Sequence, residues 1–166
     1  MSLVRPGIPD DAPELVRLRG LMFEAMAGRS GAADPTPEPW QPAAEAVLRE
    51  RLAQPAPDLT MPVFVVDDPG RPGRLAACAV GTLERRLPAP GHPDGLFGFV
   101  FNICTDPGHR RRGYARACTE ALLGWFDDRH ATRIDLHASS AGVELYRGLG
   151  FREHSIALSR RHPAEV

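Results

Sequence analysis

Apolar residues in the first third of the chain recur with the period of a helix. Steps of three and four residues predict an amphipathic helix over residues 10–28, with an apolar face formed by Leu15, Leu18, Met22 and Met26. A second, shorter helix is expected over residues 43–54. The segment from 28 to 42 between them is rich in glycine and proline, which predicts a loop that contains Trp40.

The rest of the chain alternates between short strand-like runs and helical patterns. Residues 113–128 and 141–150 carry apolar positions at helical spacing. Runs rich in valine, phenylalanine and isoleucine, bounded by Gly/Pro turns, predict strands over residues 3–6, 61–68, 74–86, 96–105, 133–139 and 151–160. The second and third of these runs are close enough in the chain to form a hairpin.

This order of elements predicts an α/β fold of the mixed kind, in which helices lie on the faces of one mixed sheet. The strands on either side of the 113–128 helix are expected to run parallel, through a right-handed crossover. A length of 166 residues suits a single domain over residues 1–166.

The net charge of the chain excludes few classes of function. The 20 basic and 21 acidic residues leave a net charge of −1, so the molecule as a whole does not attract nucleic acid. Every basic residue is an arginine. Together with the abundance of alanine, proline and glycine, this indicates a GC-rich bacterial genome.

The three cysteines, Cys78, Cys104 and Cys118, lie in apolar segments without paired spacing, so we interpret them as reduced core residues. The first residues lack the apolar core of a signal peptide, and no apolar run approaches the ~20 residues that span a membrane. These observations favour a cytoplasmic protein. The histidines lack metal-ligand spacing, so no metal site is expected, and His109 beside a turn proline is expected to be exposed.

Candidate chemistry concentrates in the stretch TDPGHRRRGYAR, residues 105–116, where a strand is followed by a helix. A helix N-terminus exposes unpaired amides and the positive end of its dipole, and glycine lets the backbone come close to a ligand. With three arginines, the stretch predicts a pyrophosphate site. Neither G-x-x-x-x-G-K-[ST] nor G-x-G-x-x-G is present, and the pattern that does occur is R-x-x-G-x-A.

The R-x-x-G-x-A pattern of Arg110, Gly113 and Ala115 resembles the acyl-coenzyme A loop of the GNAT superfamily of N-acetyltransferases. ASSAGVELYRGLGF, residues 138–151, resembles the second signature of that family, a helix with a tyrosine followed by Gly-Phe. The opening LVRPGIPDDAPELVRL is similar to the first strand and helix of the family. The resemblance implies a mostly antiparallel sheet of about six to seven strands, and a parallel, splayed strand pair that forms the acyl-CoA cleft.

The resemblance also implies that acetyl-CoA is the co-substrate and which residues contact it. The loop amides that hold the pyrophosphate correspond to residues 111–116, and the strand that pairs with the pantetheine arm corresponds to residues 103–105. Ser139 stands where many members have an asparagine. The implied contacts are Ile103, Cys104, Thr105, Arg110, Arg111, Arg112, Gly113, Tyr114, Ala115, Arg116, Ser139 and Tyr146.

Two of these residues are implied in catalysis. The Ile103 amide corresponds to the donor that stabilises the thioester oxyanion, and Tyr146 to the tyrosine that protonates the leaving thiolate. Many members also carry a Glu or His base on the strand before the loop, but residues 96–105 contain no carboxylate or histidine. An ordered water chain, Glu24 or His137 are the alternatives for that base.

We therefore expect an N-acetyltransferase that transfers the acetyl group of acetyl-CoA directly to a primary amine of a small molecule. One alternative is a non-catalytic acyl-CoA-binding module, which the missing carboxylate favours, and another is a nucleic-acid-binding protein, which only the arginine cluster favours. Residues 28–42 and 87–96 are expected to face the acceptor, and Asp34 and Glu38 favour a cationic amine. The family is compatible with a homodimer.

Overall fold

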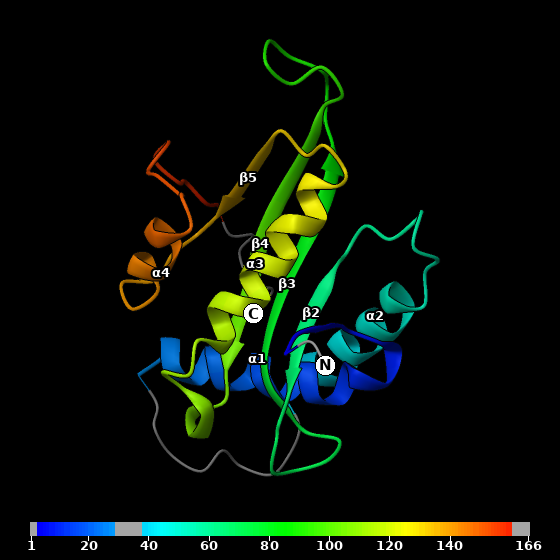
Figure 1. Cartoon of the computed structure of the whole chain (residues 1–166), viewed down its shortest axis with the longest axis vertical. Helices are drawn as coiled ribbons and strands as arrows, with labels where there is room; N and C mark the ends of the chain where they lie inside the picture. The colour runs from blue at the N-terminus through cyan, green and yellow to red at the C-terminus, as the bar shows by residue number, and fades with distance from the viewer. Residues whose placement is uncertain (1–2, 29–37, 161–166) are drawn as a thin grey trace.

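A computed structural model describes residues 3–28 and 38–160 and contains a five-stranded sheet (Figure 1). The strand order is β1-β2-β3-β4-β5, and every neighbouring pair is antiparallel except β4 and β5, which are parallel. The strands are β1 (Arg5–Pro6), β2 (Val63–Asp67), β3 (Leu75–Arg85), β4 (Leu96–Thr105) and β5 (Arg133–Leu136). The predicted mixed sheet and its parallel pair are confirmed, with fewer strands than the predicted six to seven.

Helices cover both faces of this sheet. Residues of α1 and α2 pack on one face, whereas α3 lies across the other and α4 lies beside the β5 edge (Figure 1). The helices are α1 (Ala12–Met26), α2 (Trp40–Leu52), α3 (Tyr114–Asp127) and α4 (Val143–Gly148), with 3-10 turns η1 (Pro9–Asp11) and η2 (Pro107–His109). None of the helices in the described part of the chain has the length and apolarity that crossing a membrane requires.

The predicted last strand over residues 151–160 is wrong. The chain there forms no regular element, and the two apolar side chains of its alternating pattern, Ile156 and Leu158, are 88% and 91% exposed. A strand forms only when a neighbouring edge pairs with its backbone, and this segment pairs with no strand in the described residues. The alternation of apolar and polar residues over 151–160 therefore does not correspond to a strand in this protein.

The second helix begins at Trp40, three residues earlier than predicted. Pro42 lies in its first turn, where a missing amide hydrogen has no cost because first-turn amides have no partner within the helix. Trp40 is consequently not a loop residue. Its ring packs edge-to-face on Phe23 of α1, with the ring centroids 5.5 Å apart.

The contact between α3 and the sheet depends on two glycines. Phe126 is completely buried, and a Cβ atom at Gly81 of β3 or Gly98 of β4 would lie 2.9 to 3.0 Å from its ring. The two glycines thus leave the space that the aromatic ring fills. This packing fixes α3 over the neighbouring strands β3 and β4, and with it the position of the loop that precedes α3.

The substitution Phe126→Ala is expected to lower the free energy of unfolding by about 3–5 kcal/mol, because it removes a fully buried ring and leaves a cavity over the two glycines. Urea unfolding measures this loss. The matched control is Leu87→Ala in the β3–β4 loop, where the side chain is 86% exposed and the change should stay within about 0.5 kcal/mol. Equal losses in the two variants would contradict the described packing of α3.

Candidate active site

The candidate site begins where β4 and β5 separate. Their pairing ends at Val100 opposite Leu136, whereas β4 stays paired with β3 as far as Thr105 opposite Ala77. The amide of the next residue, Asp106, donates to the Ala76 carbonyl at 2.8 Å and so points toward β3.

Amides alternate in direction along a strand, so those of Ile103 and Thr105 point to the other side, away from β3. Beyond Val100 that side of β4 no longer pairs with β5. A length of strand edge whose hydrogen-bonding groups have no partner in β5 therefore leads toward the loop before α3. The structure thus brings three predicted contacts, Ile103, Cys104 and Thr105, to the place where β4 and β5 diverge.

A β-bulge lies at the same point. Val80 pairs with Asn102 and Gly81 pairs with Val100, so Phe101 is an extra residue in β4. A bulge re-aims the side chains around it. Here the buried Asn102 side chain lies on the α1 side of the sheet, where its Nδ2 is 3.6 Å from Cys78 Sγ.

The predicted pyrophosphate loop has an unusual backbone. Gly113 has φ 79° as the residue before α3, and Arg111 has φ 64°, a left-handed conformation that is uncommon for a residue with a side chain. Such strained conformations concentrate at functional sites, and backbone turns of this kind form concave anion sites. Arg110, Arg111 and Arg112 are exposed here, and none forms an ion pair with a described residue.

Two partly buried contacts hold this loop on the rest of the fold. His109 was expected to be exposed, but its side chain is only 14% exposed and its Nε2 lies 3.0 Å from Asp68 Oδ2 in the β2–β3 turn. The Gly70 amide lowers the pKa of Asp68, and His109 adds to this effect. The aromatic ring of Tyr114 stacks on His109 with the ring centroids 6.2 Å apart.

The second contact joins the loop to α1 through Asp106. Arg17 donates to Asp106 at 2.7 Å, to Glu14 at 2.8 Å and to the Leu75 carbonyl at 2.9 Å. Burial raises the pKa of Asp106, but the hydrogen bonds from the Gly108 amide and Arg17 together lower it by more. The pKa of Asp106 therefore lies below its ordinary value, and the carboxylate is the form that the fold stabilises.

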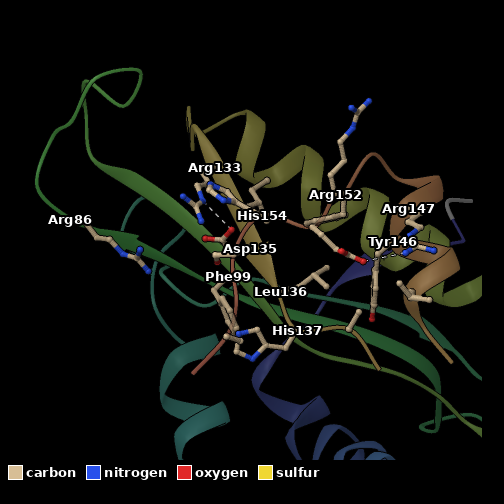
Figure 2. Close-up of a pocket in the computed structure, with 17 residues that line it drawn as sticks. Arg86, Phe99, Arg133, Asp135, Leu136, His137, Tyr146, Arg147, Arg152 and His154 are labelled. Atoms are coloured by element: carbon tan, nitrogen blue, oxygen red, sulfur yellow. Dashed lines mark hydrogen bonds and ion pairs between the residues drawn. The ribbon is translucent and has the colours of Figure 1, made fainter. Parts of the chain in front are cut away.

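Tyr146 lines a pocket of about 520 Å³ between β5 and the C-terminal segment, together with Phe99 and His137 (Figure 2). Phe99 and His137 pack edge-to-face with centroids 5.4 Å apart, and Tyr146 lies apart from them, toward Arg147. Burial raises the pKa of Tyr146 above its ordinary value of 10. The hydroxyl is therefore protonated at neutral pH and can act only as a proton donor or hydrogen-bond partner there.

The remaining predicted contacts lie around α3 and α4. Arg116 is 3.5 Å from Glu120 of its own helix, and its guanidinium occupies the space that a side chain at Gly148 would need. Ala115 lies in the first turn of α3. Ser139 supports the turn before α4 through its carbonyl, which accepts hydrogen bonds from the amides of Gly142 and Val143, and its side chain is exposed.

The cysteines near the site are unsuited to covalent chemistry. Burial raises the pKa of Cys104 to about 11 and that of Cys118 to about 12, so both are thiols at neutral pH. A thiol is a weak nucleophile compared with a thiolate. Among the described residues, no group of three or more His, Cys, Asp and Glu side chains is placed to hold a metal ion.

The two segments expected to face the acceptor lie in different places. Residues 87–96 lead into the start of β4, about 13 Å along the strand from Val100, where the open edge begins, and about 30 Å from Thr105, where it ends, at 3.3 Å per residue. Of residues 28–42, the part 29–37, with Asp34, lies outside the described residues. Glu38 accepts a hydrogen bond from Trp40 Nε1 at 3.0 Å.

Comparison with known proteins agrees with this geometry. Residues 27–151 match the family model of the acetyltransferase (GNAT) family, which is more than half of the chain. The chain belongs to that family and is an acetyl-CoA-dependent acyltransferase. Comparison with the curated proteins gave no significant match.

Solved structures share the fold over nearly the whole chain. A GCN5-related N-acetyltransferase from Ralstonia eutropha is 26% identical, with a TM-score of 0.75 and coverage of 95% of this chain and 97% of its own. A predicted acetyltransferase with acetyl-CoA from Clostridium acetobutylicum is 20% identical, with a TM-score of 0.75 and coverage of 95% and 94%. A glucosamine-6-phosphate N-acetyltransferase from Arabidopsis thaliana is 15% identical, with a TM-score of 0.71 and coverage of 95% and 96%.

The substitution Gly113→Glu is expected to weaken acetyl-CoA binding at least tenfold, about 1.4 kcal/mol, because a carboxylate would project where we expect the pyrophosphate. Calorimetric titration measures the affinity. Gly91→Glu is a matched control, because Gly91 has φ 80° against 79° for Gly113 and a Cβ at either position meets open space. Both variants carry the same backbone strain, so an equal effect on affinity would place the pyrophosphate elsewhere.

The substitution Asp106→Asn is expected to reduce the decrease in the free energy of unfolding that the protein shows at acidic pH. Because the pKa of Asp106 is below its ordinary value of 3.8 in the folded protein, its contribution is present above about pH 4. The contribution disappears as the pH falls through the folded pKa, because the unfolded chain binds the proton first. Urea unfolding between pH 5 and pH 3 should show a smaller decline in the variant than in the wild type, and an identical decline would contradict the role of the Arg17 contact.

Proposed function

We propose that this enzyme is an N-acetyltransferase that transfers the acetyl group of acetyl-CoA directly to the primary amine of a small molecule. The observation that carries the proposal is the open edge of β4, which runs from the β4–β5 divergence to the arginine loop at the start of α3. An extended, thiol-terminated arm with an anionic group at its other end is the kind of ligand that such an edge and loop would fit together.

In this proposal acetyl-CoA binds along that path. The pyrophosphate lies on the amides of residues 111–116, with Arg110 and its neighbours adding charge attraction. The pantetheine arm pairs with the edge of residues 103–105 as an additional strand would. The thioester carbonyl then receives a hydrogen bond from the Ile103 amide, which strengthens as negative charge develops on the oxygen during attack. Ser139, from the turn before α4, and Tyr146 of α4 approach the thiol end.

The chemical step needs no covalent enzyme intermediate. The neutral amine attacks the thioester carbon, a C–N bond forms, and the C–S bond breaks as the tetrahedral intermediate collapses. The leaving thiolate takes a proton from Tyr146, whose raised pKa keeps that proton available at neutral pH. Cys104 takes no part, since its pKa of about 11 leaves it protonated.

The amine must lose a proton in the same cycle. His137 supports this role better than Glu24, because His137 follows β5 and lines the same pocket as Tyr146, whereas Glu24 lies on α1 and outside that pocket. We propose His137, directly or through water, as the acceptor of that proton, which solvent then returns to the Tyr146 phenolate. Its edge-to-face contact with Phe99 holds the imidazole next to the divergent strands.

The substitution Tyr146→Phe tests the proposed acid. It removes one hydroxyl and keeps the ring that packs edge-to-face on Phe151, so the free energy of unfolding should change by no more than about 1 kcal/mol. The kcat for amine acetylation should fall roughly 100-fold, the usual effect of losing a positioned acid. Thiol release in the steady state measures kcat.

A thioester with a more acidic thiol provides the internal control for this variant. Its thiolate leaves with less help from an acid, so the defect of the Tyr146→Phe enzyme should shrink with it. A variant with full kcat, or one equally impaired with every leaving group, would make Tyr146 a packing residue.

A further inference from the structure

Arg19 of α1 lies beside the β4 residue that precedes the proposed oxyanion donor. Its Nη1 donates to Asn102 Oδ1 at 3.0 Å, and Asn102 immediately precedes Ile103, whose amide we assign to the thioester carbonyl. The bulge at Phe101 brings the Asn102 side chain to the α1 side of the sheet. A guanidinium is therefore held one residue from the strand position where the acetyl group would be presented.

Two exposed aromatic rings flank this guanidinium. Its central carbon lies 4.7 Å from the ring centroid of Phe23 and 5.9 Å from that of Phe101. These rings are 39% and 38% exposed, which is unusual for phenylalanine, and Trp40 supports the Phe23 ring from α2. The surface around Arg19 is therefore an open apolar patch with one cation in it.

The charge of Arg19 is not neutralised within the described residues. No described carboxylate lies within ion-pair distance of it, whereas Arg17, two residues earlier, binds both Glu14 and Asp106. The hydrogen bond to Asn102 uses one of the five N–H donors of the Arg19 guanidinium. Partial burial lowers the pKa of Arg19, which is the direction expected for a cation that loses water without gaining an anion.

A half-buried cation with unused donors is costly for a fold unless it binds something. The planar fork of an arginine matches a carboxylate, which accepts two parallel hydrogen bonds in one plane. A flat anion also fits the aromatic surroundings. We propose that Arg19 binds a carboxylate of the acceptor, so that the acceptor is an amine of the amino-acid type, with an apolar part against Phe23 and Phe101.

This inference rests on the proposed N-acetyltransferase activity, and it goes further by giving the acceptor a chemical class. The two groups of the acceptor would bind at separate places, the amine at the reaction centre and the carboxylate at Arg19. A purely positioning role for Arg19, in which it only holds Asn102 and the bulge, predicts equal losses with every acceptor. Only a role in binding predicts a loss confined to acceptors with a carboxylate.

The experiment compares phenylalanine with phenylalaninamide and phenethylamine in wild-type enzyme, Arg19→Gln and Arg19→Lys. The kcat/KM is expressed per neutral amine, because the three amino groups differ in basicity. The wild type should prefer phenylalanine over the amide at least tenfold. Arg19→Gln, which can still donate to Asn102, should lose that preference while its rate with the amide stays within threefold, and Arg19→Lys should retain part of it.

Arg85→Gln is the control, because Arg85 lies at the other end of the sheet from the divergence and its removal should leave the preference unchanged. Phosphoethanolamine and taurine distinguish other anions, and a stronger preference for either would overturn the carboxylate assignment. An unchanged preference in Arg19→Gln, or none in the wild type, would overturn the inference while amine acetylation stands.

Binding separates this inference from the proposed activity. In the coenzyme A complex, N-acetylphenylalanine should bind at least tenfold more tightly than N-acetylphenylalaninamide, and Arg19→Gln should abolish the difference. That titration tests Arg19 even if no amine supports thiol release, a result that would contradict the proposed function. Equal binding of the two compounds to the wild type would contradict the carboxylate site.

Discussion

The separation of two parallel strands is the constraint on which the rest of the site depends. Backbone amides in a sheet almost always find a partner, and those of Ile103 and Thr105 are directed away from β3 at the point where β5 has turned away. A ligand with its own amide groups can complete this pairing. In the proposed site the linear part is therefore a strand edge that has lost its β5 partner, rather than a set of added side chains.

The charged part of the candidate site is a loop rather than a strand edge. Two side-chain contacts hold the segment that precedes its arginines. Asp106 before the 3-10 turn is bound by Arg17 of α1, and His109 at its end is bound by Asp68 of the β2–β3 turn. With these two contacts partly buried, the segment before the arginines and the glycine is held on the rest of the fold. Preorganised groups of this kind lose little entropy on binding an anion.

Sequence patterns predicted most of this fold because most elements contain their own signal. The β4 strand over 96–105 was predicted with its observed bounds, and the helix after Gly113 within one residue. The C-terminal strand over 151–160 failed because alternation around Ile156 describes a strand only if an edge is available. Sequence order contains no information about that edge.

The candidate site also combines a part that the sequence predicted with a part that it did not. The arginine loop is a local motif, and its residues lie together as the motif implies. The supports of the loop were not predicted, since Asp68 is 41 positions before His109 and Arg17 is 89 positions before Asp106. Arg19 was missed for a further reason: a lone arginine on a helix is ordinary in a sequence, and only its aromatic neighbours and lack of an anion in the described residues distinguish it.

The 20 basic residues of the chain include no lysine. Arginines therefore form the ion pairs with carboxylates on α1, α2 and the loop before α3, and this has a chemical consequence. Lysine is the side chain that acetylation modifies, whereas a guanidinium stays protonated and is a poor nucleophile. An enzyme that handles acetyl-CoA therefore presents no side-chain amine to its own reagent. Its arginine ion pairs keep their charge throughout turnover, because acetyl-CoA finds no lysine side chain to modify.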